Sequence, residues 1–363
     1  MAQPLRSSTI RRDRPIEEDR RGSAAPILHN SQHEGESGAR TADPLASPGV
    51  QTLVTGGAGF IGSHLVDALV ADGHQVRVLD DLSTGAAANV DPAAELVEGD
   101  VAAAADVAAA VAGAEVVFHQ AARGSVQRSV EDPLTTDRVN IHGTLTVLAG
   151  ALEAGARRVV HASSSSVYGG AGPLPTPESA PVVPRSPYAV TKAAAEQYCR
   201  VFAELHGLET VALRYFNVFG PRQRADSAYA AVIPRFIDHL RRGEAPTVHG
   251  DGRQSRDFTF VSDVVAANQA AAAAPAERCA GRVYNIAGGR DRSLLELLDV
   301  LAKILDVRPE PHHGEPRAGD IRHSRAEVAA AAADLGFHCQ VDFATGLAAT
   351  VGWFATPRGP AGP

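Results

Sequence analysis

The segment Thr55–Gly62 (TGGAGFIG) most restricts what this chain of 363 residues can fold into. It follows a short apolar run and precedes an apolar pattern with helical spacing, which predicts a tight turn between a strand and a helix. Gly56 permits such a turn, Gly59 lets a ligand approach the backbone, and Gly62 allows the helix to pack closely on the strand. The N–H groups at the start of the helix favour a pyrophosphate. The segment therefore predicts a dinucleotide-binding turn.

A carboxylate stands at the end of the next predicted strand. Asp80 lies 18 residues past Gly62, where an acid can accept hydrogen bonds from the adenosine ribose hydroxyls. The neighbouring Asp81 adds a second negative charge, which repels a 2′-phosphate, so NAD is predicted as the cofactor rather than NADP. Asp100 closes the third predicted strand, where it is expected either to bind the adenine amino group or to cap a helix.

Short apolar runs alternate with alanine-rich helical patterns from Gln51 onward, which is typical of a parallel sheet with helices on both faces. Strands are predicted at residues 52–55, 75–80, 94–98, 116–119, 158–162 and 210–214, with helices that begin near Phe60, Val101, Asn140 and Ala189. This rhythm predicts a doubly wound parallel Rossmann sheet of the α/β class. After Gly220, proline and glycine interrupt the pattern, and further helices are predicted at 231–242, 263–274 and 294–305.

Three parts of the chain are therefore predicted. Residues 1–49 hold seven arginines and seven acids without apolar periodicity, which predicts a disordered N-terminal extension rather than a targeting peptide. The alternative is a translation start near Val50, immediately before the first strand. Residues 50–220 are predicted to form the NAD-binding Rossmann domain. Residues 221–356 are predicted to form a smaller C-terminal α/β substrate lobe, partly interleaved with the Rossmann domain.

Composition limits the partners of this chain. Its 42 acidic and 34 basic residues give a net charge of −8, which provides no basic footprint for nucleic acid or an anionic membrane. No stretch of the sequence reaches the ~18 apolar residues that a membrane span requires. The cysteines, Cys199, Cys279 and Cys339, are too few and too scattered for a disulfide framework or a zinc site. We expect a cytoplasmic protein without a metal site.

Tyr188 and Lys192 lie four residues apart at the start of a predicted helix, which places them on one face. A free phenol has a pKa of about 10, so its use as a base at about pH 7 requires about 4 kcal/mol of stabilisation for the phenolate. A neighbouring ammonium and a positively charged nicotinamide can supply it. Only two of the 34 basic residues are lysines, so this lysine does not reflect a lysine-rich surface. The pair is predicted to be catalytic.

The serine run Ser163–Ser166 ends the fifth predicted strand at the carboxyl edge of the sheet, where ligands of such folds bind. We expect these hydroxyls to relay protons and to bind substrate. The fourth strand ends in Gln120 followed by two alanines, which leave room for a cofactor. His119, at the end of that strand, is expected to be a buried core histidine rather than a ligand.

Residues 50 to about 355 resemble the UDP-hexose 4-epimerases of the extended short-chain dehydrogenase/reductase superfamily. The resemblance is carried, in order along the chain, by the motifs TGGAGFIGSH, VLDDLSTG, EGDV, SSSSVYG, SPYAVTK, RYFNVFGPR and SRDFTFVSDV. Together with the patterns above, it implies that NAD is bound by Gly56, Gly59, Phe60, Ile61, Gly62, Asp80, Asp81, Ser83, Thr84, Gly85, Asp100, Val101, Gln120, Ala121, Ala122, Asn140, Tyr188, Lys192 and Tyr215.

The resemblance also implies roles for the residues around the substrate. Tyr188 matches the catalytic base of the family, Lys192 its ribose-binding partner, and Ser164 the serine that assists proton transfer. Asn217 is matched to the nucleotide-sugar phosphates, Arg256 and Arg317 to the pyrophosphate, and Asp320 to the uridine ribose; the arginine forks suit phosphate oxygens. The implied substrate-binding set is Gly124, Ser125, Ser164, Ser165, Ser166, Asn217, Ala231, Val232, Arg256, Arg317, Asp320 and Ser324.

The reaction that this resemblance implies is the inversion of C4 of a UDP-hexose through a 4-keto intermediate, with NAD as the hydride carrier. Ser324 stands at the family's gatekeeper position, where enzymes restricted to glucose and galactose carry Tyr. Gly124 and Ala231 are small as well, although the family's lysine at the Gly124 position is absent. UDP-N-acetylglucosamine and UDP-N-acetylgalactosamine are therefore the expected substrates, with UDP-glucose and UDP-galactose beside them.

Single positions in the sequence distinguish the expected activity from others in the superfamily. Ser165 and Ser166 stand where the 4,6-dehydratases of the superfamily carry Asp-Glu, which disfavours dehydration. UDP-glucuronate 4-epimerases share the SSSSVYG strand and are the second candidate, although they usually show Thr where this chain has Asn217. A non-catalytic NAD-binding sensor would have a damaged Tyr188–Lys192 pair, and both residues are intact. The resemblance further implies a homodimer that packs the helices near Asn140 and Ala189 into a four-helix bundle.

Overall fold

The computed structural model describes residues 45, 49–225, 231–316 and 321–356, all of which belong to the second of two compact units, Thr41–Pro363. Most of the expected N-terminal extension, residues 1–49, lies outside the described residues, as do Arg317 and Asp320 of the expected substrate site.

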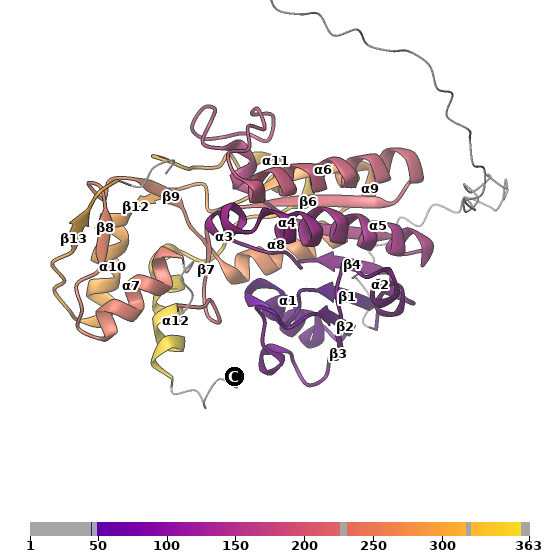
Figure 1. The fold of residues 1–363 in the computed structure, drawn as a ribbon, viewed down its shortest axis with the longest axis horizontal. Helices are drawn as coiled ribbons and strands as arrows, with labels where there is room; N and C mark the ends of the chain where they lie inside the picture. The colour runs from indigo at the N-terminus through magenta and orange to yellow at the C-terminus, as the bar shows by residue number, and fades with distance from the viewer. Residues whose placement is uncertain (1–44, 46–48, 226–230, 317–320, 357–363) are drawn as a thin grey trace, which may run out of the picture. The chain divides into compact units, whose positions relative to one another are not determined.

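Seven parallel strands form the central sheet, in the order β11–β6–β5–β4–β1–β2–β3 (Figure 1). They are β1 (Gln51–Thr55), β2 (Gln75–Asp80), β3 (Glu95–Glu98), β4 (Val116–His119), β5 (Arg158–Ser164), β6 (Glu209–Tyr215) and β11 (Arg282–Ile286). The strand order reverses at β1, which pairs with β2 on one side and with β4 on the other. The predicted doubly wound α/β sheet is confirmed. In such sheets a dinucleotide binds beyond the carboxyl ends of the strands at the reversal point.

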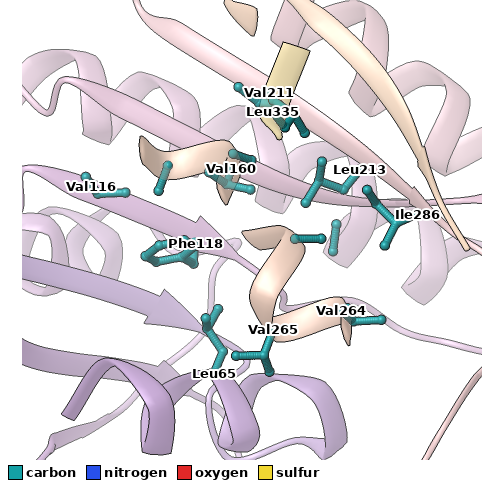
Figure 2. Packing of buried hydrophobic residues seen from close by; sticks show 14 of the residues in the cluster. Leu65, Val116, Phe118, Val160, Val211, Leu213, Val264, Val265, Ile286 and Leu335 are labelled. Carbon is teal, nitrogen blue, oxygen red and sulfur yellow. The ribbon is translucent and has the colours of Figure 1, made fainter. Parts of the chain in front are cut away.

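Helices cover both faces of this sheet. They are α1 (Phe60–Ala71), α2 (Ala104–Val111), α5 (Gly143–Glu153), α6 (Pro187–His206) and α8 (Val261–Ala273). Val54, Phe118 and Val160 belong to the apolar cluster that includes α1 and α8, part of which Figure 2 shows. The residues directly before these three, Leu53, Val117 and Val159, belong to a second cluster, which also contains residues of α2, α5 and α6. Because both faces are buried, the strands are continuous apolar runs, and this is why their positions were readable in the sequence.

A smaller group of elements follows the sixth strand. Its helices are α7 (Val232–Arg241), α10 (Leu294–Leu305) and α12 (Phe343–Ala355), and its two-stranded sheets pair β7 (Val218–Phe219) with β10 (Thr259–Phe260), β8 (Thr247–His249) with β13 (His312–Gly314), and β9 (Ser255–Asp257) with β12 (Asp291–Ser293). Phe219, Ile237, Leu297 and Leu347 lie in its separate apolar core. Helix α8 and strand β11 follow Gly220 in the chain, but they pack with the central sheet. The division of the described chain into two domains at Gly220 therefore stays a prediction.

The remaining short elements connect these layers. They are η1 (Ala87–Asn89), α3 (Val126–Glu131), α4 (Pro133–Asp137), the π-helical turn η2 (Arg138–His142), η3 (Ser165–Tyr168), α9 (Ala276–Cys279) and α11 (Ala329–Leu335). In the part of the chain that the structure describes, no helix is both long and apolar enough to span a bilayer. Over the same residues, no three His, Cys, Asp or Glu side chains gather in a way that would hold a metal ion.

Two expected helices begin elsewhere. The helix expected near Val101 begins at Ala104, because the Asp100 carboxylate accepts the N–H of Ala102 at 2.8 Å and holds that segment in a turn. The helix expected near Asn140 is the continuation of α4 through the π-helical turn η2 into α5. Strand β11 was not predicted, since its five residues carry no distinguishing pattern.

Candidate active site

The glycine-rich turn lies between β1 and α1. Gly56 has a φ of 71°, and a Cβ added to it would lie 2.6 Å from the backbone N of Ala121 on the neighbouring β4 segment. A Cβ added to Gly62 would lie 2.1 Å from the carbonyl oxygen of Gly56. Helix α1 begins at Phe60 with no side-chain cap and no acid in its first turn. The first N–H groups of a helix lack intrahelical acceptors, so this bare helix start fits the pyrophosphate of a dinucleotide.

Asp80 is bound to the same turn. Its carboxylate accepts the N–H of Ala58 and the N–H of Leu82, both at 2.9 Å, and the residue is 7% exposed. Burial raises the pKa of Asp80, and the two backbone hydrogen bonds oppose this rise. Asp81 instead holds its own loop by accepting the Ser83 hydroxyl at 2.6 Å. The loop, which also contains Thr84, returns to the glycine-rich turn, where Gly85 packs against the backbone of Ala58.

Asp100 is not the N-cap of α2, whose N-cap position is Ala103. Besides the N–H of Ala102, its carboxylate contacts Arg138 at 2.7 Å. Although burial acts to raise the pKa of Asp100, the hydrogen bonds from Ala102 and Arg138 lower it overall. Val101, the next residue of the expected cofactor set, is buried against Gly143 at the start of α5.

A buried polar cluster joins the ends of β4 and β6. The Tyr215 hydroxyl lies 3.2 Å from Oε1 of Gln120 and 2.8 Å from Nδ2 of Asn268 on α8, and Gln120 Nε2 donates to Asn268 Oδ1 at 2.9 Å. Burial raises the pKa of Tyr215 to about 12, so its phenol stays protonated. The cluster fixes the strand end beside Ala121 and Ala122, and Asn268 is a member that the sequence patterns did not reveal.

Asn140 holds the backbone of the loop that follows Ala122. From the π-helical turn, its Oδ1 accepts the N–H of Arg123 at 2.7 Å, and its Nδ2 donates to Thr191 Oγ1 at 3.0 Å. Asn140 is 1% exposed, and Thr191 lies on α6 beside Lys192. The amide therefore ties the loop expected to face the cofactor to the helix that carries the predicted catalytic pair.

Tyr188 and Lys192 occupy the first turns of α6. The helix begins at Pro187 after the N-cap Ser186, whose Oγ accepts the N–H of Ala189 at 3.1 Å. The Lys192 ammonium lies 5.9 Å from the centre of the Tyr188 ring and donates to the carbonyl oxygen of Ala162 on β5 at 2.7 Å. Lys192 is 3% exposed, and burial lowers its pKa to about 8.

Ser164 ends β5, and its side chain interacts with that of Tyr188. Burial raises the pKa of the Tyr188 phenol, and the interaction with Ser164 acts in the opposite direction. Ser165 and Ser166 continue into η3, and Ser164 Oγ accepts the N–H of Ser166 at 3.2 Å. The structure thus brings together three residues of the expected catalytic set from two separate elements, at the carboxyl edge of the sheet.

The other expected substrate residues that the structure describes lie on loops, on the strand β9 and at the start of the helix α7. Gly124 is exposed, and a Cβ placed there would meet no atom within 4 Å. Ser125 is the N-cap of α3 and has a φ of 98°. Asn217, with a φ of 34°, donates to the carbonyl oxygen of Asp257 at 3.1 Å. Arg256 lies on β9, the Ser324 N–H donates to Ser255 at 3.1 Å, and Ala231 and Val232 begin α7.

The comparisons with known proteins agree with this geometry. The profile of the NAD dependent epimerase/dehydratase family matches residues 52–287. The chain is similar to a UDP-glucose 4-epimerase from Mycolicibacterium smegmatis, with 42% identity over 313 residues that cover 84% of this chain and 98% of the relative. It is also similar to the solved structure of a UDP-N-acetylglucosamine 4-epimerase from Methanobrevibacter ruminantium, with a TM-score of 0.80 and 38% identity over 85% of this chain and 99% of the other.

Dehydratases occur among the similar structures as well. A dTDP-glucose 4,6-dehydratase from Streptomyces venezuelae, solved with NAD bound, has a TM-score of 0.77 and 33% identity over 84% of this chain and 97% of the other. All three relatives are matched over nearly their whole length. Because the family profile spans more than half of the sequence, this chain belongs to the NAD dependent epimerase/dehydratase family, and NAD is its cofactor.

Proposed function

We propose that this protein is a UDP-hexose 4-epimerase that accepts N-acetylated sugars. The observation that carries the proposal is the placement of Tyr188 and Lys192 on α6 beside Ser164 at the end of β5, with the Lys192 ammonium bound to the carbonyl oxygen of Ala162 at 2.7 Å, at the sheet edge that also holds the glycine-rich turn. A phenol paired with a hydroxyl at this place can exchange a proton with a sugar hydroxyl. Similarity to 4-epimerases of UDP-glucose and UDP-N-acetylglucosamine supports the reaction class.

The residues would divide the proton chemistry among them. The Tyr188 phenolate removes the proton from O4 of the sugar and becomes the neutral phenol, either directly or through the hydroxyl of Ser164, whose side chain interacts with it. The Lys192 ammonium offsets the effect of burial on the Tyr188 phenol by favouring the phenolate. NAD, when bound, would reversibly accept the hydride that leaves C4 of the sugar. Tyr188 returns the proton to O4 at the end of the cycle, so no proton is lost.

Inversion of C4 requires the 4-keto sugar to present its second face to the same groups. We propose that the UDP part stays bound while the sugar turns, held by Arg256, Asn217, Arg317 and Asp320. Asn217 lies beside β9, the strand that carries Arg256, since it donates to the carbonyl oxygen of Asp257 at 3.1 Å. Arginine forks bind phosphate oxygens through two parallel hydrogen bonds, which suits such a tether.

Dehydration is less well supported than epimerisation. Removal of water from C5 and C6 of a sugar needs an acid and a base beside the catalytic phenol. The two residues after Ser164 in η3 are Ser165 and Ser166, and neither hydroxyl is acidic enough for that role. The small side chain of Ser324, at the position matched to the family's gatekeeper, and the similarity to a UDP-N-acetylglucosamine 4-epimerase support acceptance of an N-acetyl group.

We further propose that the protein is a homodimer. Large apolar side chains are exposed along α3, α4 and α6: Val126 (49%), Val130 (63%), Leu134 (82%), Val190 (48%) and Leu205 (73%). Patches of this kind mark protein–protein contacts. Light scattering after gel filtration would give twice the chain mass for a dimer, whereas the monomer mass would contradict this proposal.

The function is tested by incubating the purified chain separately with UDP-N-acetylglucosamine, UDP-glucose and UDP-glucuronate, without added NAD, while the anomeric protons are followed by NMR. Appearance of the C4 epimer of the N-acetylated sugar is expected. Conversion of UDP-glucose alone would contradict the proposed pocket but keep the reaction. Conversion of UDP-glucuronate alone would favour the second candidate activity, and no conversion after addition of NAD would overturn the proposal.

A further inference from the structure

Arg214 on β6 and Glu196 on α6 form an ion pair whose side chains are only 4% and 2% exposed. Two parallel hydrogen bonds join them, from Nε to Oε1 at 2.8 Å and from Nη2 to Oε2 at 2.7 Å. This arrangement fixes the relative orientation of the two side chains. Taking two charges out of water carries a large desolvation cost, so such a pair is weak evidence for stability. Its other contacts show what it holds.

Glu196 connects the pair to the catalytic helix and to β5. It lies one helical turn beyond Lys192, on the helix that also carries Tyr188. Its Oε1 accepts the hydroxyl of Ser163 at 2.5 Å, and Ser163 directly precedes Ser164 on β5. One residue earlier, the carbonyl of Ala162 accepts the Lys192 ammonium. Helix α6 is therefore attached to two successive residues that lead into Ser164.

Arg214 connects the same pair to the chain that follows Ser164. Its Nη1 donates to the hydroxyl of Tyr168 at 2.8 Å and to the carbonyl oxygen of Glu178 at 3.1 Å. Tyr168 ends η3, the turn that begins immediately after Ser164, and it donates to Asn285 Oδ1 at 2.7 Å. The backbone is thus attached to the ion pair on both sides of Ser164.

We propose that the Glu196–Arg214 pair positions the active site. The pair holds the Ser164 hydroxyl beside Tyr188 and the Lys192 ammonium behind these two side chains, and it does not touch the substrate. The inference deepens the proposed function and rests on it. Neither Glu196 nor Arg214 was among the predicted site residues. None of the roles predicted for those residues requires a buried ion pair between α6 and β6. The pair acts through Ser163 and Tyr168, so Glu196 and Arg214 are positioning residues.

The charge of Glu196 also acts on Lys192. Burial lowers the pKa of Lys192 to about 8, while Cys199 and Glu196 on the same helix raise it. From the sheet, His119 on β4 and His161 on β5 face this lysine. Burial lowers the pKa of His119 to about 3, and that of His161 falls well below its usual value, so both rings are neutral. Glu196 therefore favours the ammonium form of Lys192 in an otherwise apolar setting.

A matched control exists at the opposite end of the same two strands. Arg158 begins β5 and Glu209 begins β6, and the arginine donates to Glu209 Oε2 through Nε at 2.8 Å and Nη2 at 2.5 Å. Arg158 is fully buried and Arg214 is 3% exposed, whereas the side chain of Glu209 is 20% exposed and that of Glu196 only 2%. This second pair lies at the amino ends of the strands, away from Ser164, so it shares the structural role of an ion pair without the proposed positioning role.

The first test compares the steady-state kinetics of Glu196→Gln, Arg214→Lys and Glu209→Gln with those of the wild-type chain, with UDP-N-acetylglucosamine as substrate. A displacement of a catalytic group by about 1 Å lowers the rate by about 10²-fold. We therefore expect kcat to fall by about that factor in Glu196→Gln and in Arg214→Lys, while KM changes less than about threefold. Glu209→Gln is expected to keep kcat within about twofold. Circular dichroism establishes which variants are folded; if Glu196→Gln is not, Arg214→Lys carries the comparison. Wild-type kcat in either folded variant, or an equal loss in Glu209→Gln, overturns the proposal.

The second test does not depend on turnover. The chain has only two lysines, Lys192 and Lys303, so the Cε signals of ¹³C-lysine-labelled protein can be assigned with a Lys303→Arg variant. The Lys192 signal is expected to titrate at about pH 8 in the wild-type chain and at a lower pH in Glu196→Gln, with no change in Glu209→Gln. An unchanged midpoint in Glu196→Gln contradicts the inference. If the wild-type chain epimerises no UDP-sugar, the proposed function fails and this titration alone decides the inference.

Discussion

At the scale of single residues, we expect turnover to depend on the phenol of Tyr188. Tyr188→Phe keeps the ring but removes the hydroxyl that pairs with Ser164. We expect turnover to fall by about 10³-fold, because general acid–base catalysis by that hydroxyl is lost. NAD released from the denatured variant should equal that from wild-type protein in chromatography. Full activity in Tyr188→Phe would contradict the mechanism.

Lys192 predicts a pH dependence. Its ammonium is lost as the pH rises through about 8, so kcat is expected to decline on the alkaline side of that value. A Lys192→Arg variant stays charged, and its residual activity should lack this decline. Stability responds in the opposite sense. Between about pH 8 and 10.5 the folded chain binds fewer protons at this lysine than the unfolded chain, so the free energy of unfolding measured in urea should rise with pH across that window. A decrease there would show that another group dominates.

Ser324 tests the breadth of the substrate pocket. The Ser324→Tyr variant places a large side chain at the gatekeeper position next to Ser255, whose carbonyl accepts the Ser324 N–H at 3.1 Å. Conversion of UDP-N-acetylglucosamine is expected to fall at least about tenfold, while conversion of UDP-glucose is retained, because only the N-acetyl group needs the space. Competition between the two sugars in one NMR tube measures the ratio directly. Equal losses for both would mean that Ser324 does not discriminate between them.

At the scale of elements, strand arginines cap helices that end without basic residues. Helices α2 and α8 have no basic side chain in their last turns. Arg77 on β2 donates to the carbonyls of Ala110 and Ala112 at 2.9 and 3.0 Å. Arg158 on β5 donates to those of Ala271, Ala272 and Ala274 at 2.7–2.8 Å. A guanidinium suits this role because it presents five donors in one plane.

Arg158→Met is therefore expected to lower the free energy of unfolding by about 3–5 kcal/mol, because it removes three hydrogen bonds to the end of α8 and leaves Glu209 and Ala272 only the longer contacts to Arg157, at 3.9 and 3.4 Å. Urea unfolding followed by circular dichroism measures this change. The exposed pair Arg200–Glu204, at 3.1 Å, provides the control, and Arg200→Met should cost less than about 1 kcal/mol. Similar losses in both variants would refute the assigned capping role.

At the scale of the whole molecule, the second compact unit begins at Thr41. Leu45 packs against the sheet cluster that contains Leu65 and Phe118, so residues just beyond this boundary belong to the fold. A chain that begins at Thr41 is expected to keep the Tm and kcat of the complete chain, since the residues it lacks lie within the predicted disordered N-terminal extension. Differential scanning calorimetry and the epimerase assay check this expectation. A lower Tm would mean that residues before Thr41 contribute to stability.

The sequence by itself determined most strands of the sheet and the placement of Tyr188 and Lys192, the proposed catalytic pair, on one face of a helix. Buried parallel strands are continuous apolar runs, and the turn at Gly56 tolerates no side chain, so both leave marks that are local in the chain. Tyr188 and Lys192 were readable because helical spacing places residues four apart together. By contrast β11, with five residues and no flanking signal, acquires its place only by pairing with β6.

Only the tertiary structure decided how the catalytic pair is supported. Ser163, Glu196 and Arg214 lie on three elements, and Asn268 reaches Tyr215 from a fourth, so their contacts join residues far apart in the sequence. No local pattern distinguishes Glu196 from an exposed helical acid, although it follows Lys192 by one turn. A buried charge is identified by its partner across the core, and that partner is fixed by strand order and packing rather than by the neighbouring sequence.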